Sequence, residues 1–127
     1  MPRRASYNAG MHVLAVITDL MVQSRVAEQA KRRGWEVSFA DTPGRLRDAL
    51  AAHEGPVVVD LHAQGVDWRE AVRLAKERSL PLLAFGRHTE ASLLREACDA
   101  GCDRVVPRST FVEEMPALIE ELAAAPG

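Results

Sequence analysis

The sequence lacks the features that mark several large protein classes. No apolar run approaches the ~20 residues that a membrane-spanning helix needs. The stretch before Met11 contains two arginines but no apolar segment of signal-peptide length. We therefore expect a cytoplasmic protein without a membrane association, in which residues 1–10 are a flexible lead.

The chain has no excess of positive charge either. Its formal net charge is −2, whereas a general nucleic-acid binder usually presents a basic face or stripe. Its 127 residues, 47% of them hydrophobic, suffice for one buried core. We find no internal repeat, low-complexity linker or second domain, and we expect a single domain over residues 11–124 with a tail at 125–127.

Cysteine is scarce, and its two occurrences do not predict a metal site. Cys98 and Cys102 are spaced like a helical pair that chelates a metal, but Gly101 is expected to end the helix before Cys102. No histidine lies near them at ligand spacing. We interpret both as small, buried core residues whose thiols stay reduced.

Sequence motifs of enzymes are also missing. The chain has no Gly-x-Ser-x-Gly motif and no phosphate-binding glycine-rich loop, and Ser109 has no histidine or lysine close in sequence. We do not expect an enzyme that acts on a separate substrate.

What the chain does contain is an alternation of apolar strands and amphipathic helices. Strands separated by helices of about ten residues predict βαβ units and a parallel sheet. Thr42 and Asp67 are predicted helix N-caps, with Pro43 at a first helical position. The expected strands are 12–17, 35–40, 57–61, 82–85 and 104–107. The expected helices are 22–33, one that opens at 42–43, one from 67 to before Pro81, 89–100, and 111–124 with a kink or late start at Pro116.

The predicted fold class is α/β, a flavodoxin-like three-layer sandwich. Its five-stranded parallel sheet has the order 2-1-3-4-5 and is covered by five helices, because right-handed crossovers leave few other topologies. In such a sheet ligands bind beyond the carboxyl ends of strands one and three. Thr18 and Asp19 leave the first of these strands and Asp60 leaves the third, so we expect the two acidic residues to converge.

Asp60 is the most informative residue of this edge. The preceding Val57-Val58-Val59 predicts a strand that is buried on both faces. Because a charge is costly inside such a strand, Asp60 is expected at its carboxyl end, where the strand emerges.

Three further segments resemble those of a known family. Residues 60–65 read Asp-Leu-His-Ala-Gln-Gly, similar to Asp-Leu-x-x-Pro-Gly. Residues 101–108 read Gly-Cys-Asp-Arg-Val-Val-Pro-Arg, and residues 36–50 match a strand and helix. Over nearly all of residues 11–124 the chain resembles the receiver domain of bacterial response regulators. The resemblance implies that Asp60 accepts a phosphoryl group from a histidine kinase.

The resemblance also implies a Mg²⁺ ion held by an acidic pair, the acceptor aspartate and a backbone carbonyl. The candidate ligands are Asp19, Asp60 and the carbonyl of His62. The pair position reads Ile17-Thr18 or Thr18-Asp19, so at most one carboxylate remains there. We expect weak Mg²⁺ binding, and either Thr18 or Asp19 as the residue that faces the site.

Other positions depart from the receiver pattern. Gly86 stands where the family has a hydroxyl residue that bonds the phosphoryl group and draws the next loop inward. Val105 or Val106 stands where a switching aromatic is common, and Arg108 replaces the family's lysine. One hypothesis is that Arg108 pairs bidentately with unmodified Asp60 and holds one conformation constitutively. The alternative is an exposed arginine at a strand end.

The motif Asp60-x-His62-x-x-Gly65 also matches a cobalamin-binding signature. In that family the motif follows an early strand and a Gly-Gly pair comes later, whereas here it follows the third strand and the chain has no Gly-Gly pair. A short motif depends on its structural context. We do not favour this interpretation.

A small-ligand or anion-binding module is the main alternative to a receiver. It would use the same edge of the sheet, because His62 and His88 both follow strands that end there. The Gly86 N–H and the Arg108 guanidinium would complete the site. The ordinary interpretation of such loop histidines is that they are solvated.

The preferred prediction is a stand-alone receiver-like signalling protein with a degenerate phosphoacceptor site, with a two-component phosphorelay as one setting. Its output would come through contact with a histidine kinase or another signalling protein. The apolar residues of helices 89–100 and 111–124 are interpreted first as core. In receivers these helices and the strand between them form a partner face, which predicts a homodimer through that face.

Overall fold

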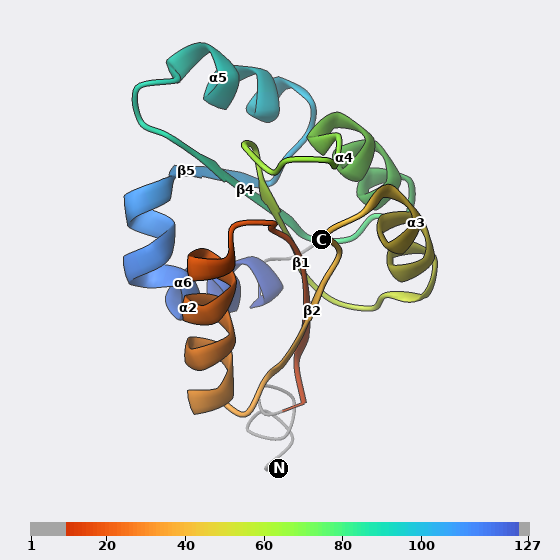
Figure 1. Ribbon diagram of the computed structural model, residues 1–127, viewed down its shortest axis with the longest axis vertical. Helices are drawn as coiled ribbons and strands as arrows, with labels where there is room; N and C mark the ends of the chain where they lie inside the picture. Colours follow the sequence, from red (N-terminus) through yellow and green to blue (C-terminus); the bar gives the residue numbers. More distant parts are fainter. Residues whose placement is uncertain (1–9, 125–127) are drawn as a thin grey trace.

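The predicted alternation is present. The computed structural model describes residues 10–124, so the predicted lead, apart from Gly10, and the tail at 125–127 lie outside the described residues. Five strands and five helices alternate within that range (Figure 1), and none of these helices is long and apolar enough to cross a membrane. In chain order they are β1 (His12–Val16), α2 (Leu20–Arg32), β2 (Glu36–Phe39), α3 (Pro43–Ala52), β3 (Val57–Asp60), α4 (Trp68–Glu77), β4 (Leu82–Gly86), α5 (Ala91–Asp99), β5 (Arg104–Pro107) and α6 (Arg108–Ala124).

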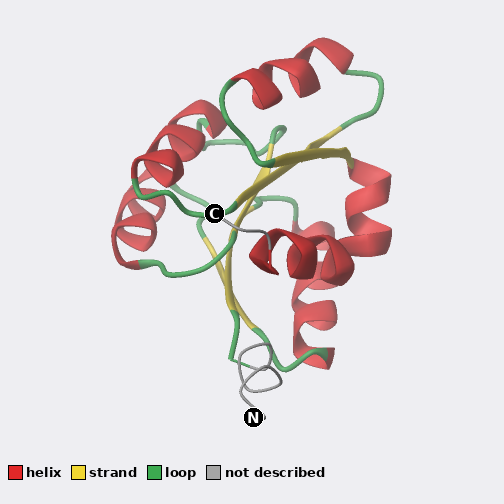
Figure 2. Cartoon of the chain, turned by 180° about the vertical axis from the view of Figure 1, so that it is seen from behind, coloured by secondary structure: helices red, strands yellow, loops and turns green. Residues whose placement is uncertain are grey.

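The strands form one parallel sheet in the order β2-β1-β3-β4-β5, which confirms the predicted topology. Helices α2 and α6 cover one face, and α3, α4 and α5 cover the other (Figure 2). Val16 of β1 pairs with Val59 of β3, and Asp60 pairs with Phe85 of β4. The carboxyl ends of β1, β3 and β4 therefore meet at one edge of the sheet.

Strand β3 is buried on both faces, as predicted. Val58 packs into the core beneath α2 and α6, whereas Val57 and Val59 pack beneath the other three helices. Side chains alternate along a strand, so this strand can present a polar group to the edge only at its end. Asp60 is that last residue.

The helix starts show where local chemistry sets the boundaries. The hydroxyl of Thr42 accepts a hydrogen bond from Arg45 N at the start of α3, and Asp67 accepts one from Arg69 N at the start of α4. Both predicted caps are confirmed. Asp19 also caps a helix, so that α2 begins at Leu20, two residues before the predicted start.

Helix α6 begins at Arg108 instead of Phe111 and is interrupted at Glu114, which has φ −119° and ψ 17°. Pro116 has no N–H to donate to the carbonyl four residues back, that of Val112. This carbonyl accepts a hydrogen bond from Gln29 Nε2 of α2 instead, at 3.0 Å. The predicted proline kink thus gives α2 a polar contact with α6.

The prediction of two buried cysteines is wrong for Cys98, which is exposed, and only partly right for the half-buried Cys102. In α5 it is Ala97 that turns into the core, which leaves the adjacent Cys98 outside. Burial raises the pKa of the Cys102 thiol to about 11, so it is not a reactive thiolate. The helix does end before Gly101, which has a φ of 108°.

The stacked pair Phe85 and Phe111 tests the packing of α6 on the sheet. Both rings are fully buried, with centroids 4.2 Å apart. Phe111→Ala should lower the free energy of unfolding by about 3–5 kcal/mol, because it leaves a cavity. Leu20→Ala, at a side chain that is 77% exposed, should change it by less than about 0.5 kcal/mol. Urea denaturation that shows equal effects of the two substitutions would contradict this packing.

Candidate functional site

Asp60 lies at the end of β3 with only 6% of its surface exposed. Its Oδ1 accepts a hydrogen bond from the backbone N–H of His62 at 2.8 Å. Burial raises the pKa of Asp60 above its ordinary 3.8, and the hydrogen bond from His62 and the charge of Arg108 oppose this effect. The carboxylate is therefore held by its own loop and is poorly hydrated.

Asp19 is fully engaged at the start of α2. Its Oδ1 accepts hydrogen bonds from Met21 N at 2.9 Å and Val22 N at 3.2 Å, and its Oδ2 accepts one from Arg108 Nη2 at 3.1 Å. These contacts, the one from Val22 N most of all, lower the pKa of Asp19. Asp19 therefore stays ionised and serves as both helix cap and ion-pair partner.

The hypothesis that Arg108 pairs bidentately with Asp60 is wrong, because Arg108 forms its ion pair with Asp19. Asp60 is buried at the end of a buried strand, whereas the Asp19 side chain is 41% exposed. All three residues still line one hollow of about 320 Å³ at the edge of the sheet. Arg108 thus brings its charge next to the site without binding the acceptor candidate directly.

The sequence left open whether Thr18 or Asp19 faces the site. Both residues line this hollow. The hydroxyl of Thr18 accepts a hydrogen bond from Gln64 N at 3.0 Å, which ties the end of β1 to the loop after β3. Ile17, the other residue of the alternative pair position, is fully buried in the core.

The hollow offers two carboxylates to a magnesium ion. Mg²⁺ requires a near-octahedral set of oxygen ligands, of which proteins usually supply one or two carboxylates and water supplies the rest. Three atoms already donate to the oxygens of Asp19, and Asp60 is its only carboxylate neighbour in the hollow. Across residues 10–124 no cluster of three histidine, cysteine or acidic side chains could hold a metal. The proposed ligand set of Asp19, Asp60 and the His62 carbonyl stays a prediction from resemblance.

Gly86 ends β4 opposite Pro107, beside the candidate acceptor. The ring of His62 lies against it, and His62 Nε2 accepts a hydrogen bond from Arg87 N at 3.1 Å. His88 is exposed and lines a second hollow of about 460 Å³, whose wall includes Arg87 and Arg108. The two loop histidines therefore face different hollows that share these arginines.

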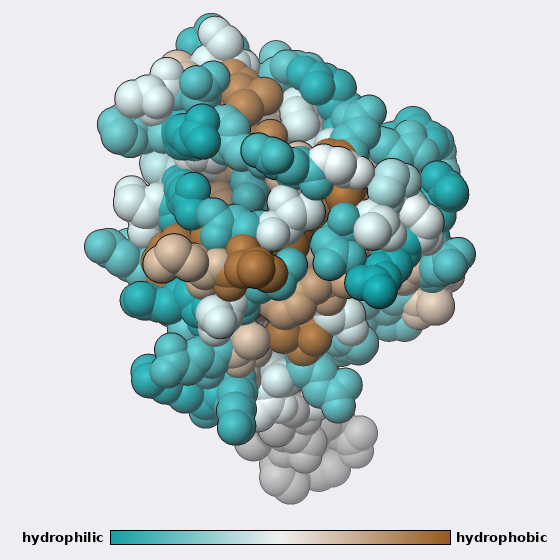
Figure 3. Space-filling view, in the orientation of Figure 1, coloured by the Kyte–Doolittle hydropathy of each residue, from teal (hydrophilic) through white to brown (hydrophobic). Residues whose placement is uncertain are grey.

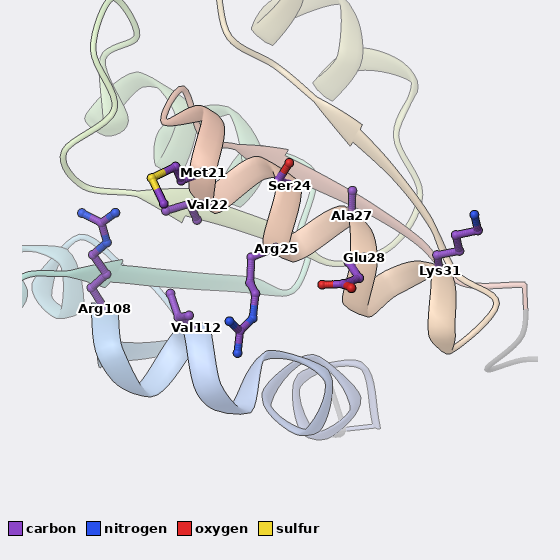
Figure 4. A pocket seen from close by; sticks show the side chains of 9 residues that line it. All are labelled: Met21, Val22, Ser24, Arg25, Ala27, Glu28, Lys31, Arg108 and Val112. Atoms are coloured by element: carbon purple, nitrogen blue, oxygen red, sulfur yellow. The ribbon is translucent and has the colours of Figure 1, made fainter.

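Another hollow was missed by sequence reasoning. A groove of about 740 Å³ runs between α2 and α6, with Met21 and Arg108 at one end and Lys31 at the other (Figure 4). Within the described chain, the only large hydrophobic side chains that stand exposed are Leu20 (77%) and Met21 (82%). Apolar surface is visible over the start of α2 in Figure 3. The signal was two adjacent apolar residues directly after the helix cap.

The architecture is shared with solved structures. Over 92% of this chain and 97% of the other, it superposes on the non-phosphorylated HemR receiver domain from Leptospira biflexa, with a TM-score of 0.73 and 18% identity. The fold is that of a response regulator receiver domain. The resemblance and the fold class predicted from the sequence are thus confirmed at the level of the fold.

Two further structures with the receiver fold are longer than this chain. Full-length FixJ from B. japonicum matches with a TM-score of 0.76 and 22% identity over 88% of this chain, which spans 57% of FixJ. A response regulator from Burkholderia pseudomallei matches with a TM-score of 0.73 and 20% sequence identity, over 90% of this chain and 69% of that one. That structure holds a phosphorylated aspartic acid, a calcium ion and citrate. No family model matches the sequence, and no curated protein matches it either.

The buried carboxylate predicts a pH-dependent effect of Asp60→Asn. Because the pKa of Asp60 is raised in the folded state, the folded protein binds more protons than the unfolded chain, and ionisation of Asp60 lowers stability as the pH rises through the folded-state pKa. Asp60→Asn should therefore increase the free energy of unfolding at pH 7, and this gain should disappear below about pH 3.8. Urea titrations of both proteins from pH 3.5 to 7 measure the difference. A loss of stability at pH 7 would contradict the account.

Proposed function

We propose that this protein is a receiver-like signalling module with a degenerate phosphoacceptor site, and that it acts through contacts with other proteins. The observation that carries the proposal is the Asp19–Arg108 ion pair beside the buried Asp60. The pair places a cation at the acceptor edge and engages the one remaining carboxylate of the metal side. Asp60 is then the candidate acceptor, and Arg108 holds the site in one state.

The partner surface in this proposal is the groove between α2 and α6. Arg25 and Lys31 line it without an ion pair to any of residues 10–124, and the one acidic lining residue, Glu28, is paired with Arg32. Exposed apolar side chains adjoin the groove at the start of α2. An amphipathic helix with acidic flanks complements both features. We propose such a helix of a histidine kinase or another signalling protein as the occupant.

The predicted homodimer through α5, β5 and α6 is a weaker proposal. Within the described residues this face carries no strongly exposed large hydrophobic side chain, and Arg104 of β5 is paired with Glu121 of α6 in the same chain at 3.1 Å. Charges already satisfied within one copy offer little to a second copy.

An anion-binding module is the second candidate function. The observation that favours it is that Arg87 and Arg108 line both the acceptor hollow and the hollow next to His88. Such a module would bind inorganic phosphate without metal, whereas a working receiver needs both metal and Asp60.

Two-dimensional NMR with Mg²⁺ and beryllofluoride tests the degenerate site. We expect no resonance shifts around Asp60, Gly86 and Arg108, because a metal ion would have to compete with the Arg108 guanidinium and two backbone N–H groups for the Asp19 carboxylate. Shifts that appear in the unmodified protein and vanish in Asp60→Asn would mean a working acceptor. Shifts with inorganic phosphate in the absence of metal would favour the anion module instead.

A pair of helical peptides tests the partner groove. Each has about 14 residues, which spans about 20 Å and matches the length of α2, and the two differ only in acidic or basic flanks. We expect the acidic peptide to shift the amide resonances of Met21, Arg25 and Lys31, and Met21→Asp to weaken its binding more than tenfold. Ala91→Asp, at an exposed residue of α5, is the matched control. Shifts confined to the face of α5, β5 and α6, or equal binding of both peptides, would exclude the groove.

A further inference from the structure

The space beside Gly86 is already filled by side chains from elsewhere. A Cβ atom at this position would lie 3.2 Å from Leu61 Cδ1, 3.2 Å from Leu94 Cδ2 and 3.4 Å from His62 Nε2. The two leucine contacts are tighter than most Cβ contacts in proteins, so a leucine would have to shift by a few tenths of an ångström, whereas the His62 nitrogen lies at van der Waals distance. A threonine would add two more heavy atoms beside both leucines and the His62 ring. The constraint on a side chain at position 86 therefore comes from its neighbours and not from the backbone conformation.

His62 is the polar member of this group. Its backbone N–H donates to Asp60 Oδ1, while its ring reaches across to the end of β4 and accepts the N–H of Arg87. Because a backbone N–H only donates, the accepting Nε2 carries no proton, which places the proton of the neutral ring on Nδ1. One half-buried side chain thus links the ends of β3 and β4.

We propose that His62 is a positioning residue that takes the place of a side chain at position 86. Its ring occupies the room that such a side chain would need, and its Nε2 holds the backbone after β4 in one position without any group bound at Asp60. The proposal deepens the proposed function, since it identifies what keeps the β4–α5 loop in a single state. It rests on contacts that do not involve phosphoryl chemistry.

The consequence concerns how the site could be repaired. Replacing Gly86 by threonine restores a hydroxyl group, but the atoms beyond its Cβ would compete for space with the His62 ring, whose Nε2 already lies 3.4 Å from the Cβ position. The two positions therefore act as a unit, and substitutions at them should not be additive.

A double-mutant cycle tests the shared space. Gly86→Thr alone should raise the unfolding equilibrium constant about tenfold, as overpacking does, and the same change in a His62→Ala background should raise it less than threefold. Leu94→Ala is the comparison for simple relief of crowding, because its Cδ2 lies 3.2 Å from the same point. Equal effects of Gly86→Thr in the two histidine backgrounds would overturn the proposal.

The hydrogen bond to Arg87 provides a spectroscopic test that a merely space-filling ring would fail. Amide hydrogen exchange at Arg87 should accelerate at least tenfold in His62→Ala and return towards the original rate in His62→Gln, whose amide oxygen can accept the bond. The ¹⁵N shift of His62 Nε2 should be that of an unprotonated nitrogen. His88→Ala, at an exposed ring one residue from Arg87, should change neither. Unchanged exchange in His62→Ala, or a protonated Nε2, would overturn the positioning role.

These results separate the proposal from the proposed function. A response to Mg²⁺ and beryllofluoride would refute the degenerate acceptor site but leave the coupling between His62 and Gly86 intact. Additive substitutions and an unchanged Arg87 amide would refute the role of His62 while the ion pair between Asp19 and Arg108 still stood.

Discussion

The site depends on the burial of β3 between two layers of helices. Because both faces of this strand are covered, its first opportunity to carry a charge is its last residue, and Asp60 is 6% exposed even there. A carboxylate with so little water must be satisfied by protein groups. Its Oδ1 accepts a hydrogen bond from the backbone N–H of His62, and its charge interacts with Asp19 and Arg108, which line the same hollow. The burial of β3 thus determines which groups can stabilise Asp60.

Charge balance at the edge is achieved between α2 and α6. Asp19 caps one helix and Arg108 begins the other, and their ion pair bridges the two helices at one end of the groove. Since Arg108 lines both the acceptor hollow and the groove that begins at Met21, the two hollows share one charged wall. A group that drew Arg108 away from Asp19 would change the end of the groove at the same time. This geometry connects the acceptor candidate with the proposed partner surface.

The end of β4 is held from the opposite side. His62 bonds Arg87 and packs on Gly86, so the loop that leads to α5 is positioned from β3 and not by a side chain of its own strand. With the ion pair on one side and the ring on the other, both walls of the site are set by contacts within the unmodified chain.

By itself the sequence determined the strand order, the helix caps at Thr42 and Asp67 and the place of Asp60, because periodicity, capping and burial are local or follow from chain connectivity. Only the tertiary structure decided which carboxylate Arg108 would choose. It also brought the His62 ring beside Gly86 and placed Met21 at the end of a groove. These contacts join segments distant in sequence, where a difference of a few ångströms in side-chain reach selects one partner over another.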